Sequence, residues 1–271
     1  SGFDKDGYLF TNTYLGDYPM FLPGGKEQIA GEYQPGWMLL SYGKKVSVSS
    51  SLEGYPAENI VDEDARTAWV AQSNRDMEWA QVDLQRLSSI HAIQVNFDEY
   101  GANQKGAVSG VYQSYLIYAS VNGEDWSLVV DYGTKKTDTP HDYIEFEEPF
   151  KARYIKLQNK EYMVSENFSV RDLRIFGKGQ GSTPRAVNDF TVERDEADPC
   201  KARLCWEAVP DAQGYIVRYG IAGDKLYNNF QVMGENTLEI GSLNKGVAYY
   251  FTIDAYNENG ITRTSRIKVC R

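Results

Sequence analysis

Short segments in which apolar and polar residues alternate recur along the chain from residue 45 onward. Within one of them, Ile93, Val95 and Phe97 would share one face of a strand. The other face would carry Ala92, Gln94 and Asn96. Apolar residues almost nowhere recur at helical spacing for three turns, so the pattern predicts an all-β fold. Strands are expected over residues 80–84, 90–97, 114–120, 143–146 and 152–157.

Local composition predicts how the chain is divided. Gly, Ser, Thr and Pro cluster over residues 177–184, and we expect a linker at 180–184 between a domain over 45–179 and another over 185–271. Residues 1–44 are rich in Gly, Pro and aromatics without a sustained period, so they are expected to form an irregular segment. A chain of 271 residues is long enough for two cores.

Charge and residue usage argue against several classes of function. The chain has 28 Lys and Arg against 38 Asp and Glu, a net charge of -10, and no basic run that would bind nucleic acid. No apolar stretch approaches the ~20 residues of a membrane span. Two His and three Cys leave little material for a His-rich metal site or a Cys–His nucleophile. Two alternatives are open for the cysteines. Either Cys200 and Cys270 form a disulfide and Cys205 is free, or all three are free thiols.

Five segments in order resemble the F5/8 type C (discoidin-like) family, whose fold is shared by carbohydrate-binding module family 32. They are residues 57–69 (AENIVDEDARTAW), 79–84 (WAQVDL), 118–126 (YASVNGEDW), 152–157 (ARYIKL) and 170–177 (VRDLRIFG). The resemblance implies a jelly-roll β-sandwich over the domain at 45–179. It also implies ligand contact at loops at one end of the sandwich, where sequence varies on a fixed scaffold.

One loop of this domain has the composition of a calcium site. Asp62, Asp64 and Thr67 offer hard oxygen ligands within six residues, which suits Ca²⁺. In the family that this domain resembles, the corresponding loop often holds a structural Ca²⁺. The resemblance implies side-chain oxygens from Asp62, Thr67 and Asp172 and backbone oxygens from Asn59, Asp64 and Arg171. The alternative is a solvated turn whose aspartates cap its own backbone.

Candidate sugar-binding residues lie in the loops 72–78, 98–113 and 159–169. Neutral sugars are recognised by aromatic faces that stack on a pyranose and by amides that hydrogen-bond its hydroxyls. The residues with these properties are Tyr100, Asn103, Gln104, Tyr112, Tyr162, Asn167 and Phe168. The His and Arg of the family's galactose-type pocket are lacking, since Val70 follows Trp69 and no Arg stands beside Tyr100, so a galactose-type site is not expected. Alternatively, the loop aromatics pack on neighbouring domains.

Residues 185–271 resemble a fibronectin type III domain. The segments that carry the resemblance are 202–206, 214–219 and 243–257. It implies an immunoglobulin-like β-sandwich in which Trp206 is the core Trp. Tyr249, six residues after Leu243, matches the tyrosine corner, whose hydroxyl binds back to the backbone. The implied role is that of a spacer or docking module.

The leading segment has a resemblance of its own. Residues 6–19 and 35–42 are similar to the stretch that joins a family 43-like glycoside hydrolase propeller to C-terminal modules in bacterial enzymes. This implies that the chain is the non-catalytic C-terminal part of such an enzyme, secreted, periplasmic or on the cell surface of a bacterium. The alternative is an N-terminal extension that packs on the jelly roll as extra strands.

Three functions are compatible with these observations. The favoured one is a carbohydrate-binding and spacer region that directs an upstream glycosidase to polysaccharide. An enzyme in its own right would need two carboxylates at glycosidase spacing, and no motif selects such a pair. The third is a structural docking module that packs on the catalytic domain or binds a protein partner without affinity for glycans. The expected partners are therefore a polysaccharide and an upstream catalytic domain, without nucleic acid and without a membrane span.

Overall fold

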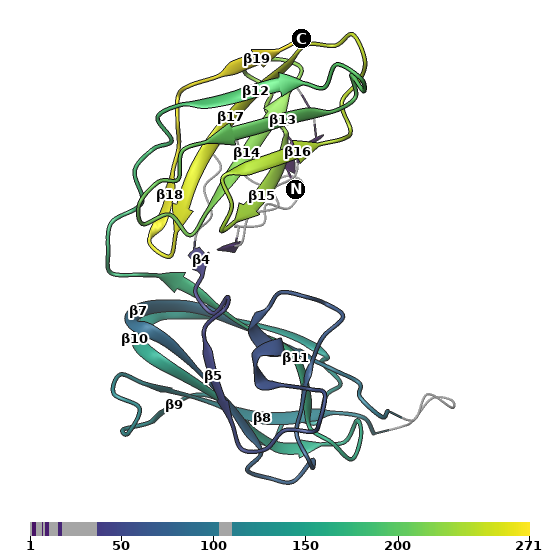
Figure 1. Ribbon diagram of the computed structural model, residues 1–271. Helices are drawn as coiled ribbons and strands as arrows, with labels where there is room; N and C mark the ends of the chain where they lie inside the picture. The colour runs from purple at the N-terminus through teal and green to yellow at the C-terminus, as the bar shows by residue number, and fades with distance from the viewer. Residues whose placement is uncertain (1, 4–6, 8, 11–15, 18–36, 103–109) are drawn as a thin grey trace. The chain divides into compact units, whose positions relative to one another are not determined.

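The computed structural model describes residues 2–3, 7, 9–10, 16–17, 37–102 and 110–271, and in these ranges it is built from β-strands with one short 3-10 helix (Figure 1). The chain divides into two compact units, Leu39–Gln180 and Gly181–Arg271 with Ser1–Met38. The division after Gln180 lies in the stretch where the sequence predicts a linker. The predicted all-β fold of two successive β-sandwiches is confirmed. No helix in the described ranges is long and apolar enough to cross a membrane.

Little of the leading segment over residues 1–44 belongs to the described ranges. Its strands are β1 (Gly2–Phe3), β2 (Leu9–Phe10), β3 (Gly16–Asp17) and β4 (Trp37–Leu39). β1 pairs with β2, and β3 pairs with β4, both antiparallel. The predictions that this segment is irregular and that it belongs to an upstream hydrolase stay predictions.

Seven strands form the sandwich of the first unit. They are β5 (Lys45–Val48), β6 (Trp69–Val70), β7 (Trp79–Phe97), β8 (Gln113–Ser120), β9 (Ser127–Tyr132), β10 (His141–Tyr162) and β11 (Ser169–Lys178). The 3-10 helix η1 (Ala57–Val61) follows β5. The strand order is β11-β7-β10-β8-β9, with β5 paired to β7 and β6 paired to β11.

β7 and β10 are long because each runs through both layers of the sandwich. The first part of β7 pairs with β5 and with the end of β10, whereas its second part pairs with β11 and with the start of β10. Between the parts, Gln85 has a left-handed φ of 67°, and the register of β10 shifts between Ala152 and Tyr154. The sequence predicted two separate strands for each of these elements. That prediction is wrong at the bends, where each strand continues through exposed residues although the ladder between them is interrupted.

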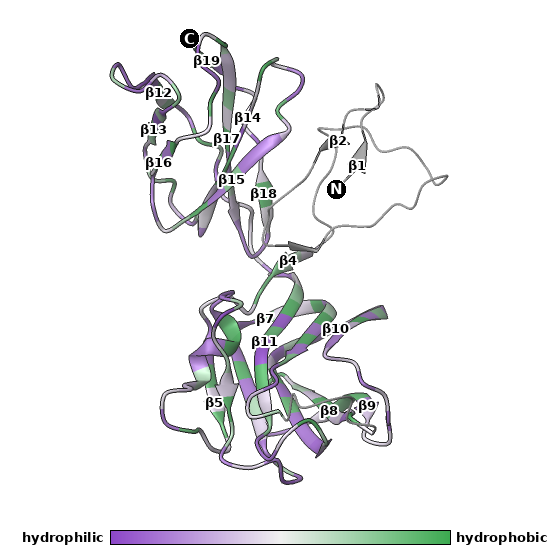
Figure 2. Cartoon of the chain, turned by 90° about the vertical axis from the view of Figure 1, so that its right-hand side faces the viewer, coloured by the Kyte–Doolittle hydropathy of each residue, from purple (hydrophilic) through white to green (hydrophobic). Residues whose placement is uncertain are grey.

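Alternation along β7 buries one set of side chains between the layers. Ile93, Val95 and Phe97 are buried, as predicted, and Figure 2 shows hydrophobic and hydrophilic residues alternating along β7, β10 and β11. Ala92 is also buried, although the sequence pattern assigned it to the opposite, solvent-facing side of the strand. The alternation slips there because β11, opposite, has a register shift between Phe176 and Gly177.

The second unit packs two antiparallel sheets face to face. The first sheet contains β12 (Phe190–Arg194), β13 (Ala202–Trp206) and β16 (Thr237–Ile240). The second sheet contains β15 (Asn228–Met233), β14 (Gly214–Gly220), β17 (Tyr249–Asn257), β18 (Gly260–Thr262) and β19 (Lys268–Cys270). The arrangement is that of an immunoglobulin-like sandwich, and membership of the fibronectin type III family stays a prediction.

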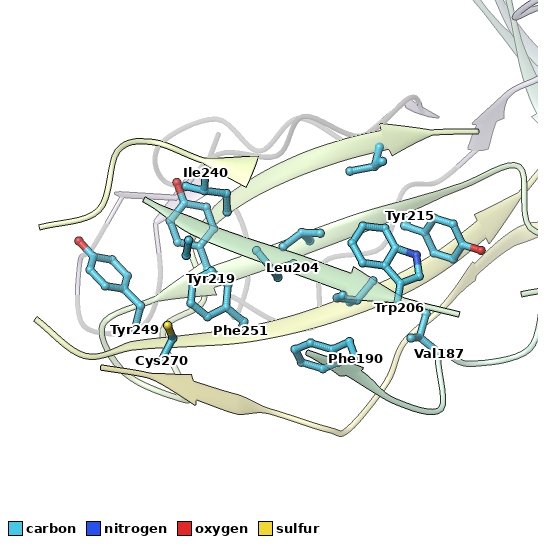
Figure 3. Packing of buried hydrophobic residues seen from close by; sticks show 14 of the residues in the cluster. Val187, Phe190, Leu204, Trp206, Tyr215, Tyr219, Ile240, Tyr249, Phe251 and Cys270 are labelled. Atoms are coloured by element: carbon cyan, nitrogen blue, oxygen red, sulfur yellow. The ribbon is translucent and has the colours of Figure 1, made fainter. Parts of the chain in front are cut away.

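The core of this unit lies between the two sheets (Figure 3). Trp206 is buried there, edge to face with Tyr215 at 5.2 Å between ring centroids. The Tyr249 hydroxyl accepts a hydrogen bond from the backbone N–H of Asn244 at 3.2 Å, the type of bond that defines a tyrosine corner. Cys205, on the opposite face of β13 from Trp206, is half-buried, and all three cysteines are free.

Candidate functional site

Loops at one end of the first unit are held together by hydrogen bonds between segments far apart in the sequence. The backbone N–H of Asp98 donates to the carbonyl of Ser169 at 3.1 Å. The N–H of Ala71 donates to the carbonyl of Phe168 at 2.8 Å. The loops that follow β6 and β7 therefore lie beside the loop that precedes β11.

Glu78 fixes the loop after β5 to the same group of loops. Its carboxylate accepts hydrogen bonds from the hydroxyls of Ser50 at 2.8 Å and Ser73 at 2.7 Å. Burial disfavours ionisation of Glu78, but the hydrogen bonds from Ser49, Ser73 and Ser50 outweigh it and lower the pKa of this carboxyl. The ionised side chain thus ties Ser49 and Ser50 to Ser73. No local pattern in the sequence marks Glu78, because its serine partners lie up to 29 residues away.

Two of these loops present a pair of tyrosine rings. Tyr55, in the loop after β5, and Tyr100, in the loop after β7, meet edge to face with ring centroids 4.9 Å apart and planes at 67°. Both side chains are half-buried, so part of each ring faces solvent. Tyr100 was predicted as a ligand residue, and Tyr55 was missed. Its position between Gly54 and Pro56, typical of a turn, was the available signal.

Arg171 connects the predicted calcium loop to the loop of Tyr100. Its guanidinium donates to the carbonyl of Ala65 and to the carboxylate of Asp98. Asp98 precedes Tyr100 by two residues, and its side chain is only 13% exposed against 36% for Arg171. This side chain therefore supports the position of Tyr100, a role that is distinct from the backbone oxygen predicted for residue 171.

Tyr162 and Phe168 are core residues of this unit. Each is only 1% exposed, and their rings meet edge to face at 5.3 Å, with Phe97 packed against both at 6.1 Å. The Tyr162 hydroxyl donates to the carbonyl of Asp98, and burial raises the pKa of this phenol. The predicted stacking of a sugar on these two rings does not fit, because neighbouring rings cover them. Both residues flank strand ends, where a loop aromatic can turn inward.

The other predicted ligand residues do not converge on one point. The hydroxyl of Tyr112 donates to Glu161 at 2.6 Å, and Lys136 lies over its ring at 4.2 Å from the centroid. The Asn167 amide is half-buried and donates to the carbonyl of Ala71 at 2.9 Å. Both side chains are thus held by protein partners. Two further candidates, Asn103 and Gln104, lie outside the described residues.

The side chains predicted to hold calcium form a compact oxygen-rich group. One Asp62 oxygen accepts from the N–H of residue 64 at 2.8 Å, and the other accepts from the Thr67 hydroxyl at 2.8 Å. Asp172 is 8% exposed, and one of its oxygens accepts from the Asn96 amide at 2.9 Å. These are the hard donors that Ca²⁺ prefers. Arg66, by contrast, pairs with the Asp64 side chain at 2.7 Å, so residue 64 could contribute only its backbone oxygen, as the resemblance implies.

The carboxylates of this group are partly buried. Burial raises the pKa of Asp172, while the Asn96 hydrogen bond and the charge of Arg174 offset part of the rise and the charge of Asp62 adds to it. Burial also raises the pKa of Glu63, although the guanidinium of Arg174, 2.9 Å from the Glu63 carboxylate, offsets part of this rise. No group of three or more His, Cys, Asp or Glu side chains in the described residues is placed to hold a metal by itself. A bound Ca²⁺ would therefore need backbone oxygens as well, and the donor set fits that requirement.

Comparison with known proteins assigns the first unit to a family. The description "F5/8 type C domain" matches residues 45–172. These residues form an F5/8 type C domain. The predicted resemblance of this part of the chain is thereby confirmed.

Curated relatives match part of the chain. Lactadherin of Rattus norvegicus is 33% identical over 110 residues, which are 38% of this chain and 25% of that protein. Lactadherin of Mus musculus is 32% identical over 110 residues, which are 38% of this chain and 23% of that protein. The chain thus spans about a quarter of the length of the curated relatives it matches.

Solved structures similar to the chain include three binding modules. Chitosan-binding module 1 of a chitosanase/glucanase from Paenibacillus sp. IK-5 is 20% identical, with a TM-score of 0.44 over 51% of this chain and 98% of that one. CBM32-1 from a family 31 glycoside hydrolase of Clostridium perfringens is 19% identical, with a TM-score of 0.42 over 50% and 96%. The family 32 module of C. perfringens NanJ, solved with galactose, is 19% identical, with a TM-score of 0.39 over 49% and 92%.

The loop end of the F5/8 type C domain can do two kinds of chemistry. The ring faces of Tyr55 and Tyr100 offer apolar surface next to polar groups, which suits the faces and hydroxyls of a pyranose. The carboxylates of Asp62 and Asp172 offer cation ligands, and Asp62 lies in the loop whose Ala65 carbonyl accepts a hydrogen bond from Arg171. The two features are connected through the pair of Arg171 with Asp98.

Proposed function

We propose that this chain is a non-catalytic carbohydrate-binding region whose F5/8 type C domain binds a polysaccharide at the loop end through Tyr55 and Tyr100. The observation that carries the proposal is the half-exposed ring pair with centroids 4.9 Å apart. Aromatic rings on rigid loops bind sugars by covering their apolar C–H faces. Because the rings stand at 67° to each other, they would contact a sugar from two sides.

Rigidity of the loops supports the same proposal. Glu78 ties the loop after β5 by its serine hydrogen bonds, and Arg171 ties the loop of Tyr100 through Asp98. A site that is already ordered loses less conformational entropy when a ligand binds. We therefore expect Tyr55 and Tyr100 to hold their places without the sugar.

Calcium forms part of the proposal as a structural ion. Asp62, Thr67 and Asp172 would supply side-chain oxygens, and residues 59, 64 and 171 would supply backbone oxygens. A cation there would offset the repulsion between the buried Asp172 and its acidic neighbours. The loop with Ala65 would then be held in place, and Arg171 binds the carbonyl of Ala65.

The wider context is proposed from the sequence resemblances. The chain would be the C-terminal part of a secreted bacterial glycoside hydrolase, periplasmic or at the cell surface, with its catalytic domain upstream. The second unit would be a fibronectin type III spacer. Its Tyr249 and Trp206 make the structural contacts that such a sandwich needs, which is compatible with a spacer role.

The proposal is tested by affinity electrophoresis of the whole chain against a panel of neutral plant and host polysaccharides, with and without a calcium chelator. The double variant Tyr55→Ala, Tyr100→Ala should lose retardation by the glycan that retards the wild type. The matched control is Tyr143→Ala, which removes an exposed tyrosine on β10. No retardation by any glycan, or equal retardation of the double variant, would contradict the proposal and favour the docking module.

A further inference from the structure

The outer face of the sheet β5-β7-β10-β8-β9 carries a second cluster of groups suited to binding, away from the loop end. Cross-strand register aligns Gln81 of β7 with Lys156 of β10, Lys156 with Tyr118 of β8, and Tyr118 with Leu128 of β9. Side chains alternate along a strand, and Ile155 of β10 is in the core, so Lys156 points to the opposite, outer face.

Lys156 is a cation between two aromatic rings. Its Nζ lies 4.1 Å from the ring centroid of Trp126 and 5.3 Å from that of Tyr118. No carboxylate pairs with it in the described part of the chain. On the same strand, Lys160 pairs with Asp76 at 2.6 Å. Burial lowers the pKa of Lys156, because water is partly excluded from its ammonium group. A hydrogen bond from this ammonium to an anion would therefore be stronger than one from a fully exposed lysine.

The turn that carries Trp126 holds this ring in place. The Asn122 side-chain oxygen accepts from the backbone N–H groups of Glu124 and Asp125, both at 2.9 Å. Gly123 takes a left-handed φ of 82°, and a Cβ there would lie 3.4 Å from the ring of Tyr154. The hairpin turn therefore lies closely against β10, and Trp126 begins the return towards β9.

Three cations lie close to one another on the strands β5 and β10 of this face. Lys45 of β5 lies opposite Asp83 of β7 in the ladder, and Arg153 pairs with Asp83 at 2.8 Å. With Lys156, the strands β5, β7 and β10 hold three cations and one carboxylate at this point of the sheet. Carboxylates also lie further out, at Asp131 of β9 and at Glu124 and Asp125 of the turn before it. The cations nearest Lys156 favour an anionic ligand there.

The same face is unusually apolar for the solvent side of a sheet. Leu128 is 48% exposed, and four aromatic side chains are half-buried around Lys156. They are Trp79, Tyr118, Trp126 and Tyr154. Aromatic rings beside an unpaired ammonium match a sugar that has an apolar ring face and a carboxylate.

We propose that this sheet face is a second glycan site, specific for an acidic polysaccharide built from uronic acids. The carboxylate of the sugar accepts hydrogen bonds from Nζ of Lys156, and the pyranose ring lies on Tyr118 and the neighbouring Leu128. The site goes beyond the loop end, since it shares no residue with Tyr55 or Tyr100. It would allow the domain to bind two segments of polysaccharide at once.

The test measures affinity electrophoresis of the whole chain in gels with polygalacturonate. Three probes are compared: polygalacturonate, the same polymer with its carboxyl groups reduced to alcohols, and dextran sulfate. Lys156→Met removes the charge and keeps most of the stem, and Lys156→Arg keeps the charge. Lys160→Met is the matched control, because it removes a paired lysine from the same strand. Near-UV circular dichroism reports whether each variant is folded.

The proposal predicts that Lys156→Met weakens binding to polygalacturonate by at least about tenfold, the effect of losing a charge-assisted hydrogen bond. Lys156→Arg, Lys160→Met and the double variant of Tyr55 and Tyr100 should bind like the wild type, and the reduced polymer should not bind. Unretarded wild type, equal loss in Lys160→Met, loss in the tyrosine double variant, or equal binding of dextran sulfate would each overturn it. If Lys156→Met is misfolded, two other results test the proposal. Lys156→Arg should bind polygalacturonate like the wild type, and the polymer with reduced carboxyl groups should not bind.

Discussion

Replacing Arg171 by Met should weaken both the stability of the F5/8 type C domain and its affinity for glycans. The variant keeps an unbranched stem but loses the bonds from the guanidinium to Asp98 and to the carbonyl of Ala65. A hydrogen bond to a charged group contributes about 1.5–3 kcal/mol, and exposed ion pairs contribute less than about 1 kcal/mol. Asp98 is 13% exposed and Arg171 36%, so we expect an intermediate loss of about 1.5 kcal/mol.

For a domain of this size, that loss corresponds to a fall in Tm of about 5 °C by differential scanning calorimetry. The affinity for the neutral glycan that retards the wild type in affinity electrophoresis should fall about fivefold, which is ~1 kcal/mol, because Tyr100 loses its support. Arg153→Met is the matched control: this arginine pairs with Asp83 at 2.8 and 2.9 Å, with side chains 40% and 18% exposed. It should cost similar stability without changing that affinity. If Arg171→Met matches the control in affinity, or leaves the Tm unchanged, the reasoning is refuted.

Three further predictions concern the metal and the two cores. Millimolar calcium should raise the Tm of the first unit, since an ion that binds only the folded state stabilises it, and Asp62→Asn or Asp172→Asn should abolish the rise seen by calorimetry. Tyr162→Ala should lower the free energy of unfolding by about 3–5 kcal/mol in urea titrations, as for other large buried aromatics; a loss below about 1 kcal/mol would contradict its place in the core. Asp254→Asn should destabilise the second unit by about 3–5 kcal/mol in the same titration. The Asp254 side chain is 1% exposed, and the change removes its ion pair with Arg218 at 2.7 Å. An unchanged midpoint would contradict this prediction.

The strands could be predicted from the sequence because alternation is a local signal. In β7 it places Ile93 and Val95 in the core, as observed. The continuity of β7 could not be predicted, since its bend at Gln85 depends on a left-handed φ in a residue that rarely adopts it. The two layers thus share strands that the pattern read as separate.

The candidate site was only partly predictable, because exposure of a loop aromatic depends on tertiary packing. Tyr100 and Tyr162 are both loop or strand-end tyrosines in the sequence, yet one is half-exposed and the other is 1% exposed against Phe97 and Phe168. Tyr55 was missed because its partner lies 45 positions further along the chain. A pair formed across such a separation leaves no local pattern.

The central claim, that the loop end binds glycan, is tested most directly by NMR. Amide shifts of the labelled whole chain would be followed while an oligosaccharide of the retained neutral glycan is added. We predict saturable shifts that cluster at Tyr55, at residues 98–100 and at residues 169–171, with little change in the second unit. Shifts confined to other surfaces, or no shifts at millimolar oligosaccharide, would contradict the account.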